Sequence, residues 1–286
     1  MTDGRMRILI TTGPSYAPID QVRRITNLAT GHIGTLLSQR LLAEGHHVFL
    51  ARGDGSTSPA PQSAPGLVVE SFGTNDDLDE LLKEWCYRHS FDAVFHAAAL
   101  GDFRVKEIHM PKEPKIFNDK DMDAGDDFDS EKDTSIFDGD GEDAEAQAGA
   151  EDDDLHHHPE PDLPPHPTPE PALSMPAKIG SEVSVLHVVL TPAKKLLPRF
   201  RQRFGPQARI VGWKYELDGS REVAVREGYQ QIETCASNAS VVNGRAYGDG
   251  FGICLPGGVV QHCADKNALV DWLAEWLAKE KEGRQP

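Results

Sequence analysis

The residues best suited to chemistry are glycines and polar side chains that follow short apolar runs. The stretch RRITNLATGHIG places Arg23, Asn27, Gly31 and Gly34 shortly after the run MRILITT and its closing Gly13. Glycine lets the main chain approach a ligand closely, and the free N–H groups at a helix start favour a phosphate. A GxxG spacing is also common where a helix packs tightly on a strand. A phosphate site and a packing role are therefore both open at this point.

Other polar residues along the chain have two possible roles each. Asn27 carries an amide that suits an acyl-phosphate oxygen, but asparagine is also a common turn former. Asp102 follows the run FDAVFHAAALG, where it either accepts from a ligand or caps the loop. Asp20 and Arg23 favour an internal ion pair or a cap. Lys178 suits a polyphosphate, although an isolated surface lysine usually contributes little.

Several standard enzyme fingerprints are missing from the sequence. It contains neither GxGxxG nor GxxxxGK[ST], which disfavours an ordinary dinucleotide-binding oxidoreductase and a P-loop enzyme. No tyrosine has a lysine four residues later, and GxSxG is absent as well. A Rossmann-type oxidoreductase is therefore the weakest of the enzyme hypotheses.

Cysteine usage and hydropathy favour an ordinary cytoplasmic protein. The four cysteines are widely spaced without a CxxC pair, so neither a metal site nor a disulfide framework is expected. No apolar run approaches the ~20 residues of a membrane span, and the polar start does not resemble a secretory signal. We expect no membrane association.

The net charge of −17 is concentrated in one segment. Residues 118–177 hold 20 of the 46 acidic residues and only 2 of the 29 basic ones, which leaves the remainder close to neutral. This balance gives no argument for nucleic acid as a partner. The acidic, proline-rich segment predicts a disordered insertion. We expect 1–117 and 178–286 to form a single domain around it.

The hydrophobic pattern outside this segment alternates between strands and helices. Helices are predicted at 33–44, 75–90, 220–235 and 265–280, and a further helix is predicted to start with Thr191 as N-cap and Pro192 at its first position. Strands are predicted at 6–12, 46–53, 66–74, 91–100 (running on into 101–107), 183–190, 208–217 and 239–244, and 250–263 suits an antiparallel hairpin.

This order predicts an α/β fold: a Rossmann-like, doubly wound, mainly parallel sheet with helices on both faces, plus a C-terminal β-hairpin and helix. Ligands of such sheets bind at the carboxyl ends of the strands, where the strand order reverses. The polar, glycine-containing segments 13–34, 100–106 and 212–220 all follow strands. We expect the site there.

Taken in order, these residues resemble the phosphopantothenoylcysteine synthetase (phosphopantothenate–cysteine ligase) family. The stretch ILITTGPSYAPIDQVRRITNLATGHIG is similar to the family's opening TxGxTxEPID and VRxIxNxSSGxxG. VFHAAALGDFRVKE resembles its AAVxDYR segment, PAKIGS its lysine-bearing flap, and IVGWKYEL its VGFxxE strand. ASNASV stands where the family has an Asn-bearing strand end.

The resemblance implies a reaction through an acyl-nucleotide, with CTP or ATP as cosubstrate and Mg²⁺ offsetting its charge. It implies that Asn27 contacts the acyl intermediate, that Asp102 lies near the nucleotide base and that Lys178 covers the triphosphate. Asn27 and Lys178 are thus the expected catalytic residues. Nucleotide binding would further involve Gly13, Gly31, Gly34, Ala98 and Gly212, and substrate binding would involve Arg23 and Asn238. A homodimer is implied, and the late hairpin is a candidate contact.

Some positions depart from the family pattern. Ala17 replaces a glutamate, Ala29 and Thr30 replace a double serine, and the flap has Gly180 in place of a second lysine. The helix at 220–235 lacks the usual phosphate-reaching lysines. The alternative is therefore a non-catalytic or repurposed nucleotide-binding protein with an acidic interaction arm. The chain begins at the synthetase-like strand, so we expect neither the flavin-dependent decarboxylase domain of fused relatives nor a flavin.

Overall fold

The structure is a computed structural model that describes residues 5–110, 177–180, 183 and 185–282. The chain divides into two compact units, 1–111 with 175–286 and 112–174, and all described residues belong to the first. The predicted insertion at 118–177 lies outside the described residues, apart from Ala177.

An eight-stranded sheet forms the centre of the described unit, in the order β12-β11-β10-β9-β6-β1-β4-β5. Six neighbouring strands are parallel, as the alternating sequence pattern predicts, and the last two are antiparallel. The predicted fold class is confirmed. The parallel strands are β1 (Arg7–Pro14), β4 (His47–Gly53), β5 (Leu67–Phe72), β6 (Ala93–Ala99), β9 (Arg209–Tyr215) and β10 (Ala239–Asn243), and the antiparallel hairpin is β11 (Phe251–Leu255) with β12 (Val259–Cys263).

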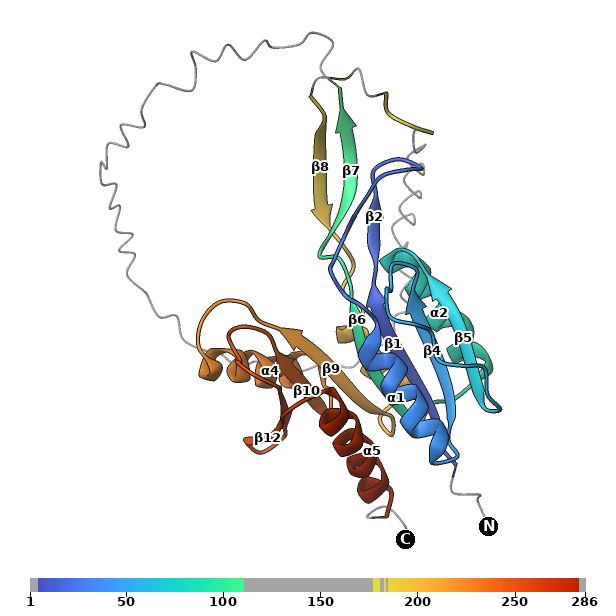
Figure 1. Cartoon of the computed structure of the whole chain (residues 1–286), viewed down its shortest axis with the longest axis vertical. Coiled ribbons are helices and arrows are strands. Elements are labelled where there is room, and N and C mark those ends of the chain that lie inside the picture. Colours follow the sequence, from blue (N-terminus) through green and yellow to red (C-terminus); the bar gives the residue numbers. More distant parts are fainter. Residues whose placement is uncertain (1–4, 111–176, 181–182, 184, 283–286) are drawn as a thin grey trace, which may run out of the picture. The chain divides into compact units, whose positions relative to one another are not determined.

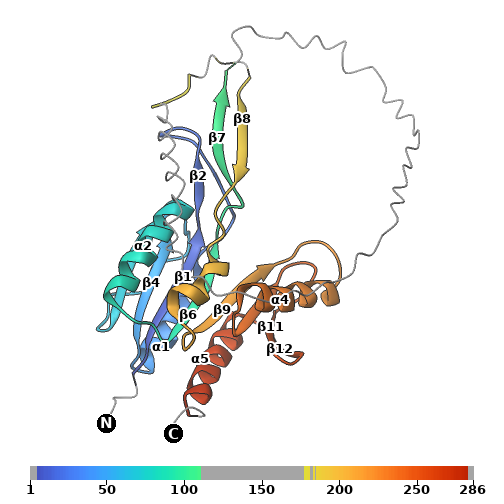
Figure 2. The same ribbon diagram turned by 180° about the vertical axis from the view of Figure 1, so that it is seen from behind.

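Helices cover both faces of the sheet (Figures 1 and 2). On one face α1 (His32–Ala43) packs beside α5 (Lys266–Glu282). The other face carries α2 (Asn75–Arg88), the short turn η2 (Leu197–Arg199) with α3 (Phe200–Phe204), and α4 (Arg221–Cys235).

The apolar stripes read from the sequence are the faces that the helices bury. In α5, Leu269, Leu273 and Leu277 are fully buried against the α1 side of the sheet. In α2, Leu78 and Leu82 are likewise buried in the opposite core. A capping box between Thr74 and Asp77 fixes where α2 starts, because each side chain bonds the other residue's N–H.

Two small antiparallel ribbons leave the carboxyl edge of the sheet. The first pairs β2 (Tyr16–Pro18) with β3 (Arg24–Thr26), and the second pairs β7 (Phe103–His109) with β8 (His187–Pro192). The sequence pattern predicted neither pairing. The segment predicted to run on from 91–100 in fact leaves the main sheet after Ala99 and forms β7.

The predicted helix start at Thr191 and Pro192 is wrong. Both residues belong to β8, where Thr191 pairs with Arg104 and Pro192 with Phe103. Helical structure begins only at Leu197. A Thr-Pro pair is a local helix-start signal, and long-range strand pairing overrides it here. A proline is tolerated at this place because the position ends an edge strand.

Candidate active site

The strand order reverses between β1 and β6. From β1 the chain adds β4 and β5 on one side, then returns to place β6, β9 and β10 on the other. Gly13 and Pro14 at the end of β1 pair with Ala98 and Ala99 at the end of β6. Such a switch point leaves a crevice beyond the carboxyl ends of the two strands, where ligands bind in this class of fold.

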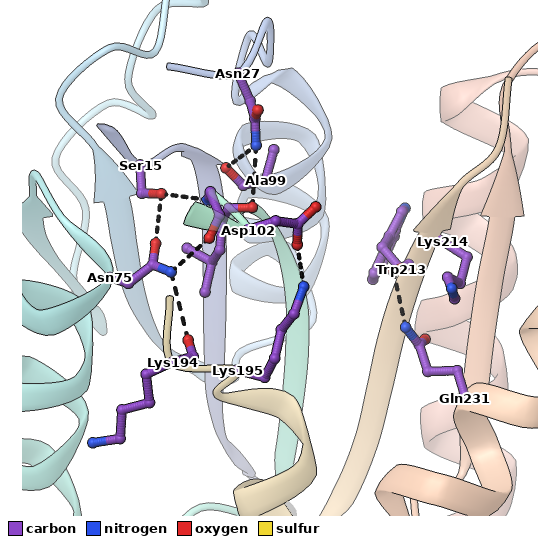
Figure 3. A network of polar contacts seen from close by, with 12 residues as sticks. Ser15, Asn27, Asn75, Ala99, Asp102, Lys194, Lys195, Trp213, Lys214 and Gln231 are labelled. Carbon is purple, nitrogen blue, oxygen red and sulfur yellow. Dashed lines mark hydrogen bonds and ion pairs between the residues drawn. The ribbon is translucent and has the colours of Figure 1, made fainter. Parts of the chain in front are cut away.

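The turn formed by residues 99–102 is anchored through its main chain (Figure 3). The Ala99 carbonyl accepts from the Ser15 N–H at 3.2 Å, and the Asp102 carbonyl accepts from the Ala193 N–H at 2.8 Å. The Asn27 amide donates to the Ala99 and Leu100 carbonyls at 3.2 and 3.1 Å. Asn27, predicted as catalytic, therefore lies directly beside this turn.

Ser15 and Asn75 hold the same turn from the other side. Ser15 is buried; its hydroxyl accepts from the Gly101 N–H at 2.8 Å and donates to Asn75 Oδ1 at 2.6 Å. The Asn75 amide in turn donates to the Gly101 carbonyl at 2.9 Å. Sequence reasoning missed both residues. Their only local signal was that Ser15 follows a strand end and Asn75 begins a helix.

Asp102 projects from the turn towards solvent and forms an ion pair with Lys195 (Figure 3). The two side chains are 66% and 64% exposed, so the pair itself adds little stability. Because both groups remain accessible, a ligand can engage either one. Lys195 is a third residue that sequence reasoning missed, and it brings a cation close to the predicted site.

Asp20 and Arg23 dock the segment that carries Lys178. The Ile179 N–H donates to Asp20 Oδ2 at 3.1 Å, and the Arg23 guanidinium donates to the Ile179 carbonyl. The prediction of an Asp20–Arg23 ion pair is confirmed, with Arg23 Nε 3.1 Å from the carboxylate. Lys178 itself is exposed. Arg23 thus holds the predicted flap next to the turn between β2 and β3.

The buried Asp20 carboxylate is kept charged by hydrogen bonds. Burial by itself would raise its pKa, but N–H groups of Ile179, Val22 and Arg23 and the charge of Arg23 outweigh this effect and lower the pKa to about 2. Asp20 is therefore ionised at neutral pH, and its contact with Ile179 persists there.

The glycine-rich turn is closely packed by a neighbouring loop. A Cβ on Gly13 would lie 1.9 Å from Ser56 Oγ, and one on Gly31 would lie 2.8 Å from it. Both glycines have positive φ, and Gly31 is the N-cap of α1. A Cβ on Gly34 would lie 2.3 Å from Thr12 Cβ. Close packing thus accounts for all three glycines.

A cleft of about 780 Å³ lies next to the start of α1. His32 and Leu36 of α1 line one side, and Tyr215 and Asn243 line it at the carboxyl ends of β9 and β10. Its polar lining also includes residues of both charges: Arg245, Asp249, Asp265 and Lys266. Its size and its mixed polar and apolar lining suit a small ligand such as a nucleotide.

Two predicted site residues lie elsewhere. Asn238 precedes β10, at the amino end of the strand, where its Oδ1 accepts from the Ile210 N–H at 2.9 Å and from Arg201 at 2.7 Å. Gly212 lies within β9 under α4, where a Cβ would meet Gln231 at 2.4 Å. The asparagine at the carboxyl end of β10 is Asn243, five residues later.

No group of three or more His, Cys, Asp or Glu that could hold a metal ion occurs among the described residues. In the same part of the chain, no helix is both long and apolar enough to span a bilayer.

The switch-point geometry and the doubly wound sheet define a Rossmann-like α/β protein, a class in which ligands bind at a crevice such as the one between β1 and β6. Residues 4–133 match the family described as "DNA/pantothenate metabolism flavoprotein C-terminal domain". The matched region contains β1 to β7, and with them the 99–102 turn and Asn27. The family resemblance noted from the motifs is thereby confirmed for the N-terminal part of the chain.

Individual proteins of known sequence or structure are also similar to this chain. The chain is 31% identical over 102 residues to the "Coenzyme A biosynthesis bifunctional protein CoaBC" of Thermococcus kodakarensis, which is 35% of this chain and 24% of that protein. The match thus spans about a quarter of that relative's length. The "DNA/Pantothenate Metabolism Flavoprotein" of Streptococcus pneumoniae shares the fold, with a TM-score of 0.66 at 18% identity over 96% of this chain and 99% of that one. A Cab2 mutant in complex with phosphopantothenate-cysteine has a TM-score of 0.56 at 15% identity over 97% of this chain and 89% of its own.

Proposed function

We propose that this protein ligates 4′-phosphopantothenate with L-cysteine at the expense of a nucleoside triphosphate, a step of coenzyme A biosynthesis. A carboxylate oxygen of phosphopantothenate attacks the α-phosphorus, and pyrophosphate leaves. The cysteine amine then attacks the acyl carbon and loses a proton, and the nucleoside monophosphate leaves as the amide forms. This chemistry depends on positioning and charge stabilisation, without a nucleophilic side chain of the protein.

The observation that carries the proposal is the Asn27 amide held against the 99–102 turn at the switch point, within the region that matches the family. Both N–H bonds of this amide are directed to the turn. In the proposed role, Asn27 Oδ1 faces the acyl intermediate, Asp102 lies near the nucleotide, and Lys178 covers the triphosphate. Arg23 orients the substrate indirectly, by holding the segment that carries Lys178.

The cleft beside α1 is the proposed nucleotide site. Gly13, Gly31 and the first turn of α1 would face the phosphates, since helix N-termini favour anions, and Asn243 would replace Asn238 as the polar group at the end of β10. Mg²⁺ would bind together with the nucleotide, through the oxygens of the triphosphate, as is usual for nucleotide-bound Mg²⁺. CTP and ATP are both compatible with this lining. We further propose a homodimer that acts in the cytoplasm.

Pyrophosphate release tests this function directly. The full chain is incubated with Mg²⁺, cysteine, 4′-phosphopantothenate and either CTP or ATP, and each component is omitted in turn. Release that depends on phosphopantothenate, with an amide product that depends on cysteine, is the expected result. No release with either nucleotide would contradict the ligase.

A second candidate is a nucleotide-binding protein that does not ligate. Two observations favour it: Ser56 fills the space beside Gly13 and Gly31, and α4 carries only Arg221 and Arg226 where the family has lysines. Saturable binding of CTP or ATP without pyrophosphate release would support this candidate. Hydride transfer from a nicotinamide cofactor would contradict both.

A further inference from the structure

Three groups close a ring of hydrogen bonds at the switch point. The Gly101 N–H donates to Ser15 Oγ, the Ser15 hydroxyl donates to Asn75 Oδ1, and the Asn75 amide donates back to the Gly101 carbonyl, at 2.8, 2.6 and 2.9 Å. Each donor in the ring meets an acceptor. The ring therefore fixes both main-chain polar groups of the residue that precedes Asp102 (Figure 3).

The orientation of the Asn75 amide follows from its neighbours. Its nitrogen faces two carbonyl oxygens, those of Gly101 at 2.9 Å and of Lys194 at 3.5 Å. A flipped amide would place oxygen against oxygen at both contacts. The donor therefore points at the turn and the acceptor at Ser15, which leaves the Ser15 oxygen to receive the Gly101 N–H.

The ring ties together elements that are far apart in sequence. Ser15 follows β1, Gly101 follows β6, Asn75 is the first residue of α2, and Lys194 follows β8. The Ser15 carbonyl also accepts from Thr26 Oγ1 at 2.8 Å, which adds the segment that carries Asn27. Asn27 and Asp102 thus share one polar support.

We propose that Ser15 and Asn75 are positioning residues for the reaction at this site. They hold the 99–102 turn so that Asp102 and the carbonyls contacted by Asn27 stay aligned as charge develops on the acyl-nucleotide. The catalytic part of this inference rests on the proposed function. The restraint on the 99–102 turn does not depend on that function. A misplacement of about 1 Å in such a turn can cost on the order of 100-fold in rate.

The Asn75→Asp variant separates positioning from stability. A carboxylate still accepts from Ser15 but cannot donate to the Gly101 carbonyl, and it repels that oxygen. As an acid in the first turn of α2, the same carboxylate favours the helix start. The matched control is Thr74→Ala, which removes the capping bond to the Asp77 N–H and weakens the same helix start without contacting the turn. Ser15→Ala removes the acceptor of the Gly101 N–H, and Ser15→Thr keeps it.

Two measurements on the full chain test the positioning role of Ser15 and Asn75. Amide hydrogen exchange at Gly101 should accelerate at least tenfold in Asn75→Asp and Ser15→Ala, and should stay near wild type in Thr74→Ala and Ser15→Thr. Under saturating substrates, turnover should fall roughly 10- to 100-fold in the first two variants while the nucleotide KM changes less than about threefold.

The outcomes distinguish this inference from the ligase itself. Unchanged protection of the Gly101 amide in Asn75→Asp would overturn the restraint, whatever the activity. A loss of turnover no larger than that in Thr74→Ala would overturn the positioning role. If the wild type releases no pyrophosphate, the ligase proposal fails, the catalytic consequence fails with it, and the exchange data alone decide the restraint.

Discussion

At the residue scale, the candidate site depends on side chains that bind main-chain atoms. The side chains of Asn27, Ser15 and Asn75 form hydrogen bonds with main-chain atoms of the 99–102 turn. The Asp20 carboxylate likewise accepts a hydrogen bond from the Ile179 N–H. A main-chain group has a fixed position in its helix or strand. Each such bond therefore fixes the position of a side chain or turn of the site relative to the sheet. Changes to these side chains should therefore affect rate more than binding.

Replacing Asn27 by aspartate tests its role. A carboxylate cannot donate to the Ala99 and Leu100 carbonyls and adds negative charge beside an anionic intermediate, so we expect amide formation to fall at least ~100-fold. The nucleotide Kd, measured by calorimetry, should change less than about threefold. Leu28→Asp is the control, because it adds the same charge on a fully exposed neighbour. Normal product yield from Asn27→Asp would contradict the assigned role.

His96 should make stability depend on pH. Burial lowers its pKa from 6.5 to about 4, and its Nδ1 lies 2.6 Å from Thr11 Oγ1. The unfolded chain takes up a proton near pH 6.5, whereas the folded imidazole stays neutral down to about pH 4. The stability that is present above pH 6.5 is therefore lost as the pH falls through this window, by at most about 3 kcal/mol.

Urea unfolding between pH 7 and 4 measures this loss. The His96→Asn variant keeps a polar partner for Thr11 but does not titrate, so its stability should fall less across the same window. Asp20 does not interfere, because its contribution is lost only as the pH falls from 3.8 towards 2. Equal slopes for the two proteins above pH 4 would show that His96 is not responsible.

At the element scale, close approach of helix to strand sets the shape of the site. Gly34 lets α1 lie against Thr12 of β1, and Gly212 lets α4 lie against β9. The turn before α1 is short and is covered by the loop that carries Ser56. This packing sets the space that is available to a phosphate at the turn.

Gly34→Ala separates packing from helix propensity. Alanine favours a helix by ~1 kcal/mol over glycine, but its Cβ would lie 2.3 Å from Thr12 Cβ and 2.5 Å from Oγ1. We expect the free energy of unfolding in urea to fall by roughly 1–3 kcal/mol. Gln39→Ala, at an exposed position of the same helix, should change it by less than about 0.5 kcal/mol. A Gly34→Ala protein as stable as wild type would contradict the packing role.

At the scale of the whole molecule, the described unit is built from chain on both sides of a long intervening segment. β7 precedes this segment and β8 follows it, yet the two strands pair with each other. His109 lies opposite His187 in their ribbon. β9 then enters the sheet directly beside β6. The pairing partners needed for the sheet are thus all present without residues 118–172.

Deleting residues 118–172 should preserve cooperative folding. The remaining connection still joins β7 to β8, and a shorter loop costs about 1 kcal/mol less to close. We expect a single thermal transition at the wild-type temperature or slightly above it, by calorimetry. Replacing the same residues with a Gly/Ser segment of equal length is the control for composition. A non-cooperative product from the deletion would show that the segment is part of the fold.

Local patterns in the sequence were enough to determine the α/β class, the apolar faces of α1, α2 and α5, and the late hairpin, because periodicity and cap residues are local signals. They also directed attention to the polar, glycine-containing segments 13–34 and 100–106, which hold Gly13, Asn27 and Asp102. Only the tertiary structure decided that β7 pairs with β8, that Asn243 and not Asn238 ends β10, and that Ser15, Asn75 and Lys195 meet at one turn. Such meetings depend on register and on contacts between residues some 60 to 90 positions apart, as in the Ser15–Asn75, Gly101–Ser15 and Lys195–Asp102 pairs, and no local pattern encodes them.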